Sequence, residues 1–69
     1  MNKSTVKKFI AWLEEASDNE IKTRQQELLS ILSDVTTREG KADVRLALRL
    51  IDEEILARIE LDRLQSKRP

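Results

Sequence analysis

Residues 42–65 read ADVRLALRLIDEEILARIELDRLQ, a run without glycine or proline. Side chains three or four positions apart share one face of an α-helix, because each residue turns the chain by about 100°. The segment therefore predicts one long helix of roughly 36 Å, at ~1.5 Å per residue. Its first apolar face consists of Val44, Ala47, Leu48, Ile51, Ile55 and Ile59.

A second apolar face lies roughly 130° around the same helix. It consists of Leu46, Leu50, Ala57, Leu61 and Leu64. A surface helix usually carries one apolar stripe a little over 100° wide, so a single helical hairpin leaves one of these faces bare. We therefore predict a homodimer, intertwined or side by side, with the second face at its interface. The alternative is a self-contained three-helix bundle.

Two shorter helices are predicted before the long one. The run Ser17-Asp18-Asn19-Glu20 fits a capping box, in which an N-cap serine is followed three positions later by glutamate. It predicts a helix over about 18–35 and separates it from a first helix over about 5–16. Ser4 is the predicted N-cap of the first helix.

The segment 36–40 is the predicted turn before the long helix. Gly40 can adopt a positive φ that other residues resist. In a competing interpretation the helix begins at Thr36, Glu39 closes a second capping box, and Gly40 lies in the first turn at a cost of ~1 kcal/mol relative to alanine.

These elements predict a single all-α domain over residues 1–69. A short N-terminal helix precedes an antiparallel helical hairpin whose second helix is the long one. The middle helix is expected along the first part of the long helix, and the N-terminal helix beside its end.

The composition excludes several kinds of site. The 69 residues include 13 Lys plus Arg and 13 Asp plus Glu, for a net charge of zero, and no cysteine or histidine. Disulfide frameworks, zinc-thiolate sites and Ser-His-Asp or Cys-His nucleophiles are therefore impossible. We predict no catalytic residue, metal or cofactor, and no direct binding of nucleic acid by charge alone. Self-association is the expected route to stability in so short a chain.

The predicted location is the cytoplasm. The beginning of the chain lacks the apolar core of a signal peptide. No stretch approaches the ~20 apolar residues of a membrane span.

Four residues are candidates for binding a partner protein. Trp12 either anchors the first helix in the core or contacts a partner, since tryptophan is enriched at binding hot spots. Arg24 interrupts the apolar stripe of the middle helix. Arg38 and Glu39 lie at the predicted tip of the hairpin.

Two other functions compete with protein binding. Lys3, Lys7 and Lys8 would lie near Lys67 and Arg68 if the first helix packed beside the end of the long one. Such a basic group would suit phosphate contacts, as in a small DNA-associated transcription or nucleoid modulator.

The more remote alternative is an enzyme. Residues 48–58 resemble the long helix of helical chorismate mutases, in which Arg58 would match a substrate-binding arginine. In that family the helix comes first and later helices complete the site, whereas here no later helix is predicted.

Residues 13–20 (LEEASDNE), the pair Leu28-Leu29 and residues 49–58 (RLIDEEILAR) together resemble small early host-takeover proteins of Mu-like Pseudomonas phages, a group with anti-quorum-sensing members. The resemblance is one of size and pattern, so no functional residue is transferred by position. It implies a compact helical dimer in the host cytoplasm. It also implies that the chain binds and inhibits a host protein, such as a quorum-sensing transcription factor or the pilus assembly ATPase.

Overall fold

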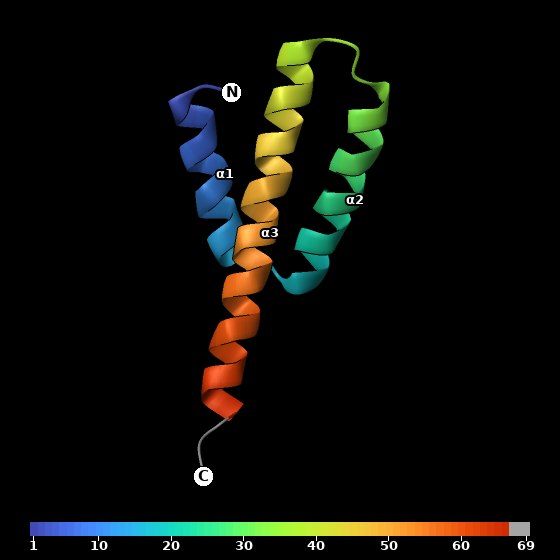
Figure 1. Cartoon of the computed structure of the whole chain (residues 1–69). Coiled ribbons are helices and arrows are strands. Elements are labelled where there is room, and N and C mark those ends of the chain that lie inside the picture. Colours follow the sequence, from blue (N-terminus) through green and yellow to red (C-terminus); the bar gives the residue numbers. More distant parts are fainter. Residues whose placement is uncertain (67–69) are drawn as a thin grey trace.

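The computed structural model describes residues 1–66. It contains α1 (Lys3–Glu15), α2 (Asp18–Asp34) and α3 (Arg38–Ser66), and no strand within the described residues (Figure 1). The predicted all-α fold, a helical hairpin with a long C-terminal helix, is confirmed. No helix in the described part of the chain has the length and apolar character that crossing a membrane requires.

The capping box at the start of α2 is present as predicted. The Ser17 hydroxyl accepts a hydrogen bond from the Glu20 backbone N–H at 3.1 Å, and the Glu20 carboxylate accepts one from the Ser17 N–H at 3.0 Å. Helix α1 begins earlier than predicted, because Asn2 and not Ser4 is its N-cap. The Asn2 side chain accepts from the Thr5 N–H at 2.8 Å, and asparagine is as good an N-cap as serine.

The segment around Gly40 differs from the predicted turn. Helix α3 begins at Arg38, and no glycine or other residue among those described has a positive φ. The Thr37 hydroxyl accepts a hydrogen bond from the Gly40 N–H at 3.1 Å, so Thr37 is the N-cap. The competing interpretation, with the start of the helix at Thr36 and Gly40 in its first turn, is closer to the structure and places the cap one residue too early. This cap and the acidic Glu39 in the first turn offset the poor helix propensity of glycine.

All three helices meet along the first half of α3 (Figure 1). Helix α2 runs antiparallel to α3, and α1 runs parallel to α3 on a neighbouring side, with the Met1 amino group against Asp43. The prediction that the first helix packs beside the end of α3 is therefore wrong. Short connections make consecutive helices antiparallel neighbours, which brings α1 back to the level of α2.

The core lies where α1 and α2 meet the predicted inner face of α3. Ile51 is 0% exposed and Ile21 is 1% exposed, and both pack with the buried Leu13 and Ala16. Five half-buried side chains surround them: Phe9, Trp12, Leu28, Leu50 and Ile55.

The last part of α3 projects beyond the other two helices (Figure 1). We call residues 56–66 the α3 extension. The radius of gyration is 14.1 Å and the long dimension is 52 Å. A compact domain of this length has a radius of gyration of about 11 Å, so the extension makes the chain markedly elongated.

Candidate functional site

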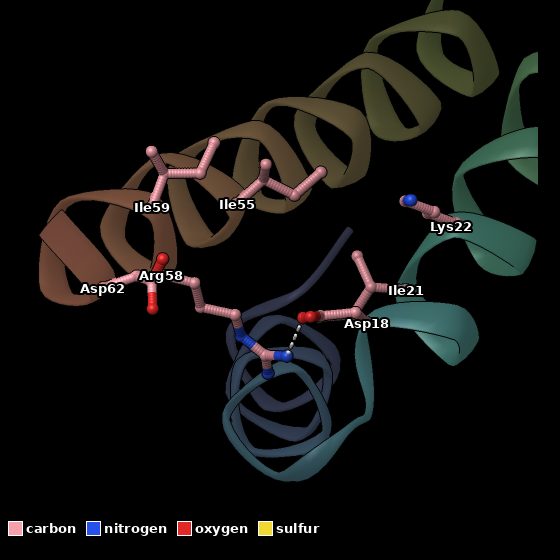
Figure 2. A pocket seen from close by; sticks show the side chains of 7 residues that line it. All are labelled: Asp18, Ile21, Lys22, Ile55, Arg58, Ile59 and Asp62. Carbon is pink, nitrogen blue, oxygen red and sulfur yellow. Dashed lines mark hydrogen bonds and ion pairs between the residues drawn. The ribbon is translucent and has the colours of Figure 1, made fainter. Parts of the chain in front are cut away.

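Arg58 joins all three helices at the base of the hairpin. Its guanidinium donates to Glu54 at 2.8 Å, to Asp18 at 2.9 Å, and to the backbone carbonyls of Leu13 at 2.8 Å and Ala16 at 2.7 Å (Figure 2 shows the bond to Asp18). The last carbonyls of a helix have no partner N–H within that helix, so this arginine completes the end of α1. The ion pair with Glu54 follows from the spacing of four residues between the two positions on α3.

The positive charge of Arg58 is paired with the two carboxylates that it contacts. Its hydrogen bonds to the carboxylates of Glu54 and Asp18 raise the pKa of the guanidinium further above its usual range. The four bonds use four of the five N–H donors of an arginine. In the mutase alternative Arg58 would bind a substrate carboxylate, and such binding needs a pair of free N–H donors. The four bonds leave only one of its donors free of these contacts.

The two aromatic side chains of the protein lie together at the surface between α1 and α2. Phe9 and Trp12 stack with ring centroids 5.7 Å apart, and the Arg24 guanidinium carbon lies 5.3 Å from the Trp12 ring centroid. Both rings are half-buried and Arg24 is exposed. We call Phe9, Trp12 and Arg24 the aromatic patch. Two of the predicted partner-binding residues are thus brought together.

The other two predicted partner-binding residues lie elsewhere. Arg38 and Glu39 are exposed in the first turn of α3. The aromatic patch lies toward the end of α1 and the start of α2, at the opposite end of the hairpin (Figure 1). The four residues therefore do not form one surface.

A groove opens between the start of α2 and the α3 extension (Figure 2). Its volume is about 520 Å³. Its lining is partly apolar, from Ile21, Ile55 and Ile59, and partly charged, from Asp18, Lys22, Arg58 and Asp62. Sequence reasoning did not single out this groove. The sequence feature that could have indicated the groove is the inner apolar stripe of the long helix, which continues to Ile59, past the length that the two shorter helices can cover.

The predicted dimer face is divided by the structure. Leu46 is only just exposed, and Leu50 is half-buried against the core beside α1. Ala57, Leu61 and Leu64 are exposed on the α3 extension. The bare apolar surface is therefore concentrated on the C-terminal half of α3.

The residues described offer little support for other kinds of site. No group of three or more acidic side chains among them is placed to hold a metal ion. Lys3, Lys7 and Lys8 are exposed on α1, beside the first half of α3. Lys67 and Arg68 lie outside the described residues, so the predicted basic group is not assembled in the part of the chain that the structure shows.

Comparison of the chain with protein-family models, with curated proteins and with solved structures finds no match.

Proposed function

We propose that this protein works without catalysis, by binding another protein through the aromatic patch and inhibiting it by occupying one of its surfaces. The observation that carries the proposal is the position of Trp12. It is stacked on Phe9 and lies beside Arg24 at the surface, while the buried core is built from aliphatic side chains.

The chemistry of the aromatic patch suits a protein partner. Tryptophan and arginine dominate binding hot spots, because a flat apolar ring and a planar cation each gain much from burial in a complementary pocket. A standard interface takes about 800 Å² from each partner. The accessible surface of the chain is 5771 Å², so one face of the molecule is large enough.

The class of partner is inferred from charge and from the phage resemblance. A net charge of zero favours a protein over a nucleic acid, whose binding depends on neutralising phosphates. The resemblance suggests a host transcription regulator, such as a quorum-sensing factor, or a pilus assembly ATPase. The inhibitor would then act in the cytoplasm of the host cell.

The test is capture of partners from nuclease-treated bacterial lysate on the immobilised protein, followed by binding measurements with each purified partner. Trp12→Leu and Arg24→Ala should each weaken binding about 30-fold, the loss typical of a hot-spot residue. Arg49→Ala is the matched control, because it removes the same charge from α3, where Arg49 is exposed and only loosely paired with Glu53 at 3.4 Å.

Helix content measured by circular dichroism shows whether each variant still folds. Folded Trp12→Leu and Arg24→Ala proteins that bind as tightly as the unmodified chain would refute the assignment of the aromatic patch. Capture that disappears on nuclease treatment would favour the DNA-associated alternative.

A further inference from the structure

We propose that the α3 extension pairs antiparallel with the extension of a second copy of this chain, so that each extension fills the groove of the other. This interface is separate from the aromatic patch and does not depend on the proposed function.

The first argument is that the core-facing stripe of α3 continues without cover. Ile51 is fully buried, Ile55 on the next turn is half-buried, and Ile59 one turn further is 48% exposed. All three lie on one side of the helix, since they are four residues apart. The bonds of Arg58 to the end of α1 and to Asp18, the first residue of α2, mark the level beyond which neither helix accompanies α3. Below that level the apolar stripe has no partner within the described chain.

The second argument is that the extension gains little from the rest of the fold. Arg58 ties the start of the extension to α1 and α2, and residues 59–66 project past both other helices (Figure 1). Isolated helices of fewer than about 12 residues are marginal in water, because most helix stability comes from packing an apolar face. Leu56, about 60° from Ile59 around the helix, is 59% exposed. Pairing with another helix supplies the missing contacts.

The third argument concerns charge. Asp18 and Arg58 are already bonded to each other, at 2.9 Å. Lys22 and Asp62 form no ion pair within the described residues, and they lie on opposite walls of the groove (Figure 2). A two-fold interface must be complementary to itself, and a groove with two cations and two anions meets that condition.

The pairing geometry places these free charges together. In an antiparallel pair centred on Ile59, position 62 of one helix lies level with position 56 of the other. Lys22 lines the groove from α2, one helical turn beyond Asp18, whose carboxylate is bonded to Arg58 at 2.9 Å. Asp62 of each copy therefore comes near Lys22 of the other copy, which gives two equivalent ion pairs for each dimer.

The area involved is that of a reversible dimer. Each copy contributes its extension and its groove, so every contact occurs twice. In a pair centred on Ile59 the two extensions overlap over residues 56–62, about 10 Å at ~1.5 Å per residue, and bury less than the 1,200–2,000 Å² of standard complexes. We therefore expect an equilibrium between monomer and dimer on the order of micromolar concentration.

Sedimentation equilibrium of the full chain over about 1–200 µM tests the proposal, in the range where such an interface associates. The mass should rise from 8.0 kDa toward twice that value. Ile59→Glu should weaken dimerisation by at least tenfold. Leu29→Glu is the matched control, because Leu29 is 53% exposed on α2 and away from the extension. It should leave the dimerisation constant unchanged.

A charge exchange tests the orientation of the helices. Lys22→Asp and Asp62→Lys should each weaken the dimer, and the two together should restore it. A chain that stays at 8.0 kDa throughout, or equal effects of Ile59→Glu and Leu29→Glu in folded protein, would overturn the proposal. Failure of the double exchange to restore the dimer would overturn the antiparallel arrangement.

Discussion

Replacing Ile51 with alanine should have one of the largest effects on stability that a single substitution can have in this protein. The change removes three carbon atoms from a side chain that is 0% exposed. At ~0.8 kcal/mol per buried methylene, the lost transfer free energy is about 2.4 kcal/mol, and the cavity left behind adds to it. The better helix propensity of alanine returns a few tenths of a kcal/mol. We therefore expect the free energy of unfolding to fall by about 3 kcal/mol, which lowers Tm by roughly 12–24 °C in a domain of this size.

The matched control is Ile31→Ala on α2, where the same three carbons are removed from a side chain that is 47% exposed. Its expected cost is about 1 kcal/mol or less, since half of that surface already contacts water. Thermal and urea unfolding of both variants, followed by circular dichroism at one protein concentration, give the difference. Equal losses in the two variants would refute the placement of Ile51 at the centre of the three helices.

Three further substitutions test separate features of the fold. Alanine in place of glycine usually stabilises a helix by ~1 kcal/mol, but Gly40→Ala should not show this gain. The added methyl group would lie 2.7 Å from side-chain atoms of Val35 and Thr37, in the loop before α3. The free energy of unfolding measured in urea tests this. Hydrogen bonds from Ser17 lower the pKa of the Glu20 carboxyl. The contribution of this carboxylate to stability is therefore present above the unfolded-state pKa and is lost as the pH falls below about 4.3. In that pH range Tm should fall more steeply for the unmodified chain than for Glu20→Gln. Arg58→Met should lower Tm clearly, because the carbonyls that end α1 lose their donor, whereas Arg49→Met should leave Tm nearly unchanged.

Local features of this chain were predictable from its sequence because they depend on residues within one helical turn of each other. The capping box of Ser17 and Glu20 needs only a spacing of three, and the ion pair of Glu54 with Arg58 only a spacing of four. The buried face of α3 follows from the helical repeat in the same way. The predicted start of α3 is wrong. The free energy gained from the Thr37 cap and the helix-propensity cost of Gly40 are of similar size and oppose each other, so local sequence does not decide between them.

The sites of the molecule depend on contacts between helices that are distant in the sequence. Arg58 bonds to carbonyls more than 40 positions away, and Trp12 meets Arg24 only because α1 and α2 pack on neighbouring sides of α3. Three amphipathic helices and their inner faces follow from local sequence alone, since the helical repeat is a local property of the chain. In the folded chain α1 covers Leu50 and leaves the α3 extension bare. No local pattern predicts this, because the relative position of whole helices depends on connection length and packing.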